Sequence, residues 1–285
     1  MLVKLGFCDT IFAEIQKLKV EFCNRCTNKS QILRGLKMEY LKITKDNIEK
    51  ENICCAMSEK QSFAKKEWLK QRFNEGLVFY RSEERGKCFI EYIPAENAWV
   101  PIVANGYIYI NCLWIAGAMK GHGYSNDLLN KCISEAKEQH KKGICILSSE
   151  KRKKEFLADS KFLEYKDFKI ADISKCGITL MYLPLEKNVE PPKFKECAKN
   201  PRIDDKDFAI YYTDQCPFTF YWVKRTEKVA KENNISLKSI HINTKEMAQN
   251  VPSPVTTYAL FYNGEFVTQA IQSDKKFLAL ASNVK

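Results

Sequence analysis

The chain has 285 residues, of which 45% are hydrophobic and 28% charged, and its formal net charge is +11. This length fits two globular domains, and no stretch approaches the roughly 20 apolar residues that a membrane span needs. Asp9 and Glu14 interrupt the N-terminal stretch and no small-residue cleavage site follows, so we expect no secretory signal, no membrane partner and a cytoplasmic location.

The lysines are spread along the chain and interleaved with acidic residues. We therefore expect no specific nucleic-acid binding, although a positive field suits phosphorylated small molecules. Of twelve cysteines, only Cys23 and Cys26 form a C-x-x-C, and there are three histidines. These numbers favour a reducing compartment and predict no metal site. The sequence leaves open whether the protein forms a homodimer.

Residues 1–37 form an N-terminal extension with two interpretations. In the first interpretation, Met38 is the true start of the protein. In the second, a short amphipathic helix around residues 10–20 packs on the rest of the chain. A peptide from upstream of Met38 in a mass spectrum of the native protein would exclude the first interpretation.

Residues 38–185 predict a mixed α/β (α+β) domain with a central sheet and flanking helices. Asp46 is the expected cap of its first helix, and Ser125 or Asn126 that of the helix after the long strand. The expected elements are a strand at 39–44, helices at 46–57 and 60–76, a hairpin at 77–95, strands at 107–117 and 144–149 around a helix at 125–143, a helix at 153–168, and strands at 169–173 and 178–185.

A linker rich in proline and charge is expected at residues 186–200, followed by a smaller domain at 201–285. Asn263-Gly264 between two β-rich runs predicts a hairpin. The expected elements are a strand at 207–215, a helix at 217–233, a strand at 237–242, a short helix, strands at 257–262 and 265–270, and a last helix.

Three of the eleven glycines lie within seven positions, in the stretch WIAGAMKGHGYSNDLL at residues 114–129. Small residues before a helix let the backbone approach an anion at the positive end of the helix dipole. Lys120 adds a full positive charge. Residues 120–125, which are Lys120, Gly121, His122, Gly123, Tyr124 and Ser125, therefore suit a pyrophosphate, although no GxGxxG fingerprint is present.

This stretch resembles the pyrophosphate loop of the GNAT N-acetyltransferases, Gln/Arg-x-x-Gly-x-Gly/Ala, with Lys120 in place of Gln/Arg and Ser125 in place of the last Gly/Ala. The element order of residues 38–185 is also similar to that family. The resemblance implies acetyl-CoA as co-substrate. It implies that the backbone of Leu113, Trp114 and Ile115 binds the pantetheine arm and that residues 120–125 hold the pyrophosphate.

For catalysis, the resemblance implies a tyrosine acid in the segment FLEYKDF, but Leu163 occupies the family position. Tyr165 is the candidate acid, with a half-buried packing role as its alternative. Glu91 is the candidate base, acting directly or through water, with an ordinary surface glutamate on a strand as its alternative. Asn111 and Cys112 are candidates to line the acceptor pocket, with a core position as the alternative for Cys112.

In the second domain, Cys216 is expected at the end of a strand and Pro217 at the first position of the following helix. The positive end of that helix favours a thiolate at Cys216. The stretch resembles the active-site turn of thioredoxin-like domains, with Pro254 as the candidate cis-proline. Thr219 occupies the position of the resolving cysteine, which excludes a dithiol cycle between these two positions. Cys216 is thus a candidate thiol, and a structural cysteine is the alternative.

Three segments together are similar to the YoaP-like acetyltransferases of bacteria: ENICCAMS, LWIAGAMKGHGYSNDLL and CPFTFYWV. We therefore expect an acetyl-CoA-dependent N-acetyltransferase that acts on a small-molecule amine. The alternative is a thiol-binding or redox adaptor that uses Cys216, with a degenerate coenzyme-binding domain.

Overall fold

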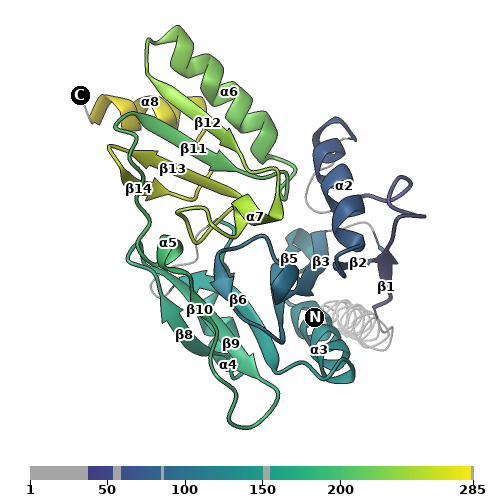
Figure 1. The fold of residues 1–285 in the computed structure, drawn as a ribbon. Helices are drawn as coiled ribbons and strands as arrows, with labels where there is room; N and C mark the ends of the chain where they lie inside the picture. The colour runs from purple at the N-terminus through teal and green to yellow at the C-terminus, as the bar shows by residue number, and fades with distance from the viewer. Residues whose placement is uncertain (1–37, 54–58, 85–86, 150–154, 284–285) are drawn as a thin grey trace, which may run out of the picture. The chain divides into compact units, whose positions relative to one another are not determined.

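The computed structural model describes residues 38–53, 59–84, 87–149 and 155–283, and the predictions for the N-terminal extension lie outside these ranges. The chain divides into two compact units, Met1–Glu39 and Tyr40–Lys285. Everything below concerns the second unit, whose described residues form an eight-stranded sheet, a four-stranded sheet and a separate two-stranded pair (Figure 1).

The larger sheet has eight strands in the order β1-β2-β3-β5-β6-β9-β8, and β7 pairs with β6. Neighbouring strands are antiparallel, except that β5 and β7 run parallel to β6. The strands are β1 (Tyr40–Ile43), β2 (Val78–Ser82), β3 (Lys87–Pro94), β5 (Tyr107–Ala116), β6 (Gly143–Ser149), β7 (Ala158–Asp159), β8 (Lys169–Ile173) and β9 (Ile178–Pro184). This is the mixed sheet that the sequence predicted.

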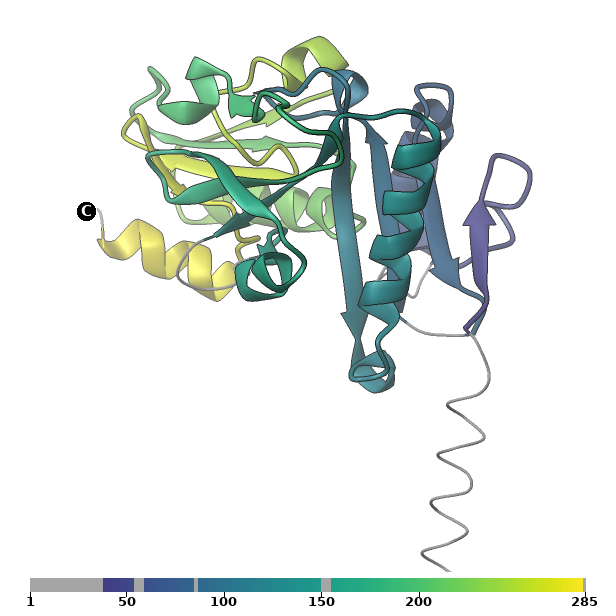
Figure 2. The ribbon, with the colours of Figure 1, turned by 90° about the horizontal axis from the view of Figure 1, so that it is seen from below.

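Alternating side chains of these strands form a separate core on each face of the sheet. Helix α3 (Tyr124–Glu138) covers one face of the sheet (Figure 2). Its Leu128, Leu129 and Cys132 pack against β3, β5 and β6. Helix α2 (Glu59–Phe73) packs on the other face, and the short α4 (Ser160–Tyr165) follows β7.

The smaller sheet has the order β12-β11-β13-β14, in which only β11 and β12 are parallel. Helices α6 and α8 pack together on one of its faces. Its elements are β11 (Phe208–Tyr212), α6 (Thr219–Glu232), β12 (Leu237–His241), α7 (Lys245–Ala248), β13 (Tyr258–Tyr262), β14 (Glu265–Thr268) and α8 (Asp274–Asn283). The predicted turn at Asn263-Gly264 joins β13 and β14, and both residues have positive φ.

The two sheets share one hydrophobic core, to which Val251 and Val255 contribute beside Trp99. The Thr256 hydroxyl donates a 2.6 Å hydrogen bond to the Trp99 carbonyl, and the Gln249 amide donates to the carbonyls of residues 96 and 98. Between the sheets, β10 (Lys193–Phe194) pairs with β4 (Ile102–Val103), and α5 (Glu196–Lys199) follows. The expected linker therefore contains regular structure, and the smaller sheet is fixed against the larger one.

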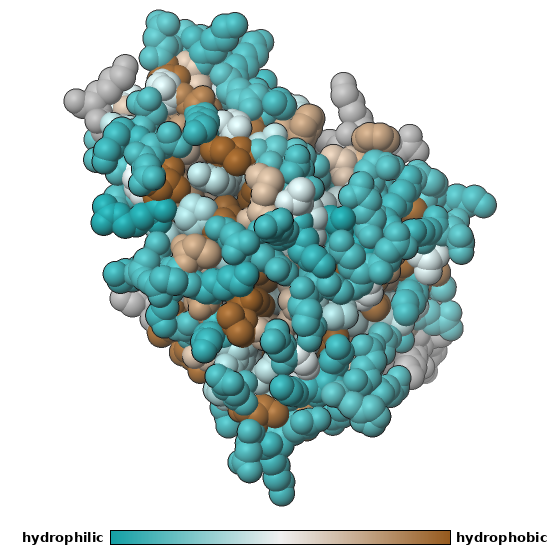
Figure 3. Space-filling view, viewed as in Figure 1, coloured by the Kyte–Doolittle hydropathy of each residue, from teal (hydrophilic) through white to brown (hydrophobic). Residues whose placement is uncertain are grey.

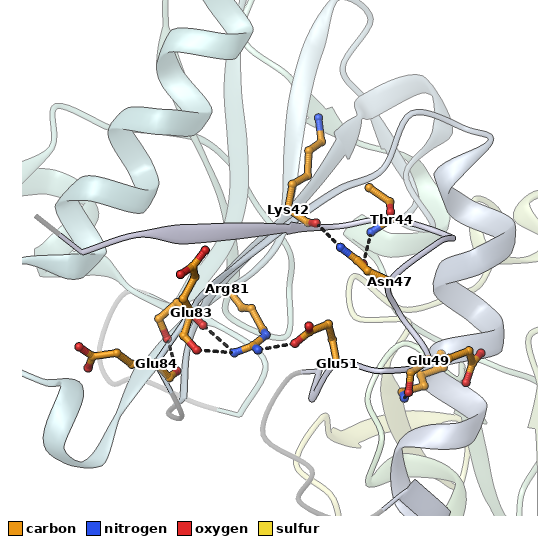
Figure 4. A network of polar contacts seen from close by, with 10 residues as sticks. Lys42, Thr44, Asn47, Glu49, Glu51, Arg81, Glu83 and Glu84 are labelled. Atoms are coloured by element: carbon orange, nitrogen blue, oxygen red, sulfur yellow. Dashed lines mark hydrogen bonds and ion pairs between the residues drawn. The ribbon is translucent and has the colours of Figure 1, made fainter.

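The predicted helix at 46–57 is wrong over residues 46–53, which form turns, and its last residues lie outside the described ranges. The Asn47 amide accepts the Thr44 N–H at 2.8 Å and donates to the Lys42 carbonyl at 2.9 Å, which closes a turn in place of a helix (Figure 4). An Arg81–Glu51 ion pair fastens the segment to β2.

The bounds of α3 and α4 and one peptide bond also differ from the predictions. The cap of α3 is Gly123 with φ of 84°, not Ser125 or Asn126, and this helix ends at Glu138 because His140 adopts a positive φ. In the predicted 153–168 helix, Asp159 caps a single short segment by accepting the Phe162 N–H. The expected cis bond at Pro254 is also wrong, since no peptide bond of the described residues is cis.

The face shown in Figure 3 is mostly hydrophilic, and its apolar side chains gather in small separate patches. Among the described residues, no helix has the length and apolar character to cross a membrane.

Candidate functional site

The larger sheet opens between β5 and β6. These strands pair only from Tyr107 to Ile110, whereas β5 continues beside β3 as far as Ala116. Asn111 is an extra residue in β5, because Glu91 pairs with Cys112 and the next residue of β3 pairs with Ile110. Such a bulge bends and twists its strand. Beyond the bulge, β5 has no strand partner on its β6 side within the described residues, and a gap forms there.

The glycine loop at residues 117–123 follows the open end of β5. Gly117, Gly121 and Gly123 have φ of 62°, 82° and 84°, a region that side chains with a Cβ rarely adopt. A Cβ built on any of them meets no atom within 4 Å, so the loop is open to solvent on this side. The positive φ values, and not crowding, explain the glycines.

The first turn of α3 has donors for an anion. In the part of the chain that the structure describes, no acceptor receives the backbone N–H groups of residues 121–125. Lys120 is exposed and has no ion-pair partner within the same ranges. Amides at a helix start, next to a lysine, favour a phosphate electrostatically. The structure thus brings Lys120, Gly121 and Gly123 to one helix end, where the His122 and Tyr124 rings stack 5.5 Å apart.

A cavity of about 740 Å³ lies on the α2 face of the sheet, beside the gap between β5 and β6. Strands β3, β5 and β6 and helix α2 form one side of it, and the smaller sheet's loops and helices form the other. The lining residues are Lys65, Lys87, Phe89, Glu91, Tyr109, Ile110, Asn111, Cys112, Leu113, Trp114, Ala116, Ile146, Leu147, Glu155, Phe156, Leu157, Ala158, Gln215, Cys216, Pro217, Phe218, Trp222, Thr257, Ile271, Ser273 and Lys276. Leu113 and Trp114 are among them, whereas Ile115 packs in the α3-side core.

Glu91 is the centre of a buried polar cluster in this cavity. Its side chain is only 2% exposed, so the expected alternative of a surface glutamate is wrong. One carboxylate oxygen accepts from the Lys65 ammonium at 2.6 Å. The other oxygen accepts from the Asn111 amide at 2.8 Å. Burying a carboxylate costs free energy unless it is paired and hydrogen-bonded in this way. Sequence reasoning selected Glu91 and Asn111 but missed Lys65, whose only signal was its helical spacing from Trp68 and Leu69.

Tyr109 also lines the cavity and was missed. Only 6% of it is exposed. Burial, with smaller effects of nearby Cys145, Cys112 and Glu91, raises the pKa of Tyr109 far above its usual value, so the hydroxyl stays protonated. Tyr165 by contrast is 76% exposed on α4 and does not line the cavity, while Leu163 is fully buried.

The smaller sheet contributes a turn to the same cavity. Gln215, Cys216, Pro217 and Phe218 lie between β11 and α6, and all four line it. Helix α6 begins at Thr219, so Pro217 lies before the helix and not at its first position. The structure therefore brings Cys216 and Glu91, which are 125 positions apart in the sequence, to one cavity. The described residues contain no group of three or more potential metal ligands.

Comparisons with known proteins show which proteins this chain is similar to. The model of the YoaP-like family matches residues 236–278. An uncharacterized N-acetyltransferase, YoaP of Bacillus subtilis (strain 168), is 42% identical over 251 residues, which are 87% of this chain and 100% of that protein.

Several solved structures resemble part of the chain at low identity. A putative GNAT-family acetyltransferase of Desulfovibrio desulfuricans covers 53% of this chain and 100% of its own, with 11% identity and a TM-score of 0.39. A putative acetyltransferase of Salmonella typhimurium, solved with acetyl-CoA, covers 54% and 97%, with 18% identity and a TM-score of 0.38. Because these scores are low, the fold assignment depends on the strand order and not on them.

The strand order, the bulge and the gap between two parallel strands define a GNAT-type α/β fold of an acyltransferase. On the evidence of the Bacillus relative, the chain belongs to the YoaP-like family of N-acetyltransferases.

Proposed function

We propose that the protein transfers the acetyl group of acetyl-CoA to the amine of a small molecule. The observation that carries this proposal is that the start of α3, with backbone N–H groups that are unpaired within the described residues, and the buried Glu91 cluster both lie next to the same strand, β5. One end of β5 leads into the glycine loop, and its bulge opens into the cavity.

The residues present fit the diphosphate of acetyl-CoA. Residues 121–125 would donate backbone hydrogen bonds, and Lys120 would add its charge. The edge of β5 beyond Asn111, around Leu113 to Ile115, would hold the pantetheine arm through backbone groups. A backbone N–H at this edge would also polarise the thioester carbonyl, which typically lowers such a barrier by a few kcal/mol.

Glu91 would accept the proton of the attacking amine, directly or through a water molecule. The Lys65 ammonium pairs with the carboxylate in its buried position, and the Asn111 amide fixes its direction. A base held in this way can remove a proton without first reorganising. Lys65 is thus a positioning residue.

Tyr109 would donate a hydrogen bond to the sulfur that leaves. Its hydroxyl is protonated at neutral pH and lines the cavity at the same strand as the bulge. Tyr165 has no role in this mechanism, because it is exposed outside the cavity.

The smaller domain resembles a thioredoxin-like fold in its order β12-β11-β13-β14, with α6 crossing between the parallel strands. This order supports the thioredoxin-like assignment, but Thr219 in place of a second cysteine argues against dithiol chemistry at this turn. The thiol-adaptor alternative is not favoured by the family to which the chain belongs.

Release of coenzyme A from acetyl-CoA, followed with a thiol reagent across a set of amines, tests the proposal. We expect amine-dependent release and saturable binding of acetyl-CoA in calorimetry. Absence of acetyl-CoA binding would overturn the proposed function.

A further inference from the structure

The smaller domain supplies about a third of the residues that line the cavity. Phe89 and Trp114 come from the larger sheet, and Phe218 and Trp222 come from the turn and helix after β11. Trp114 remains 36% exposed, and Phe218 and Trp222 are only partly buried. Large aromatic side chains left partly open around a cavity indicate a ligand that completes their burial.

The charge of the lining disfavours amines that carry several positive charges. Three lysines, Lys65, Lys87 and Lys276, face two carboxylates, Glu91 and Glu155. The Glu91 carboxylate is already paired with Lys65, and Glu155 accepts the backbone N–H of Ile271 at 2.9 Å. A cavity with more ammonium groups than carboxylates disfavours a polycation such as a polyamine or an amino sugar with several amines.

We propose that the acceptor is a monoamine attached to a flat aromatic group, and that the smaller domain selects it. The inference rests on the proposed function and names its substrate class. The aromatic group would lie among Phe89, Trp114, Phe218 and Trp222, where offset and edge-to-face contacts favour a ring over an alkyl chain. The amine would then reach the Glu91 end of the cavity.

Trp222 is the specificity-determining residue in this arrangement, and the chain offers a matched control. Phe220 lies on the same helix, two positions earlier, is 44% exposed and does not line the cavity. Replacing either ring by alanine removes an aromatic group from α6, but only the first replacement changes the acceptor site.

The test measures acetyl transfer to tryptamine, phenethylamine, butylamine and spermidine, together with the dissociation constant of acetyl-CoA. We expect the two arylalkylamines to have the highest kcat/KM. Trp222→Ala should raise their KM by about tenfold or more and leave the acetyl-CoA affinity unchanged within about twofold. Phe220→Ala should change neither quantity.

Equal or better use of butylamine or spermidine would overturn the inference while leaving the acetyltransferase intact. So would an unchanged arylalkylamine KM in the Trp222→Ala variant, or no turnover of either arylalkylamine by protein that binds acetyl-CoA. Protein that does not bind acetyl-CoA would overturn the proposed function and this inference with it.

Discussion

Gly123 offers the sharpest test of the proposed anion-binding loop, because its contribution to stability and its contribution to acetyl-CoA binding can be measured separately. It caps α3 with φ of 84°, and a Cβ added there meets no atom within 4 Å. Gly123→Ala should therefore destabilise the fold only through backbone strain, by about 1 kcal/mol. For a domain of this size, that lowers Tm by about 2–4 °C.

Gly123→Glu adds a carboxylate beside the proposed diphosphate. Two like charges about 4 Å apart repel by about 1 kcal/mol in bulk water and about 4 kcal/mol near a protein surface. Because Gly123 is exposed, we take about 2 kcal/mol, which corresponds to about 30-fold weaker binding of acetyl-CoA. Raising the salt concentration should recover part of this loss.

Gly177 is the matched control. It has φ of 77°, is exposed, and also has open space where a Cβ would lie, but it belongs to the turn between β8 and β9. Gly177→Glu should lower Tm as much as Gly123→Glu and leave acetyl-CoA binding unchanged in calorimetry. Equal acetyl-CoA affinity of the two glutamate variants would refute the assignment of the loop.

Four side chains that line the cavity, Glu91, Lys65, Tyr109 and Cys216, give four further predictions. Glu91→Gln should lower kcat by about 10²- to 10³-fold with little change in acetyl-CoA affinity, as measured by steady-state kinetics and calorimetry. Lys65→Met leaves the Glu91 carboxylate buried without its cation and should destabilise the fold by about 3–5 kcal/mol, seen as a lower denaturation midpoint. Tyr109→Phe should lower kcat by about tenfold without changing the shape of the pH profile between about pH 6 and pH 9, because burial raises the pKa of this hydroxyl beyond that range. Cys216→Ser should leave coenzyme A release within about twofold of the parent value, and a complete loss would instead support the thiol alternative.

The strands could be predicted because their patterns are local. Phe79 and Phe89 face one core while Tyr80 and Ile90 face the other, as alternation requires. The glycine loop was found in the same way, since residue type and position before a helix are visible in a single stretch. The loop's assignment to a pyrophosphate remains a prediction.

The site's polar cluster could not be predicted in full, because its partners are distant in sequence. On α2, Lys65 is buried while Phe63 is 66% exposed, the reverse of what polarity alone predicts. The ion pair with the Glu91 carboxylate, 26 positions away, explains why Lys65 is buried. The failed helix after β1 has a similar origin, since the Asn47 side chain competes for backbone groups that helix propensity ignores.

The second wall of the cavity was also beyond sequence reasoning. Its place depends on contacts between the sheets, such as the hydrogen bond from Thr256 to Trp99 across 157 positions. Sequence patterns selected Cys216 as notable, but only the fold shows that its turn and Trp222 line the same cavity as Glu91.

A crystal structure of the protein with acetyl-CoA tests the central claim most directly. We expect the diphosphate on the amides of residues 121–125 and the thioester at the β5 bulge, facing Glu91. A diphosphate bound elsewhere on the protein, or a thioester on the far side of the sheet from Glu91, would contradict the account.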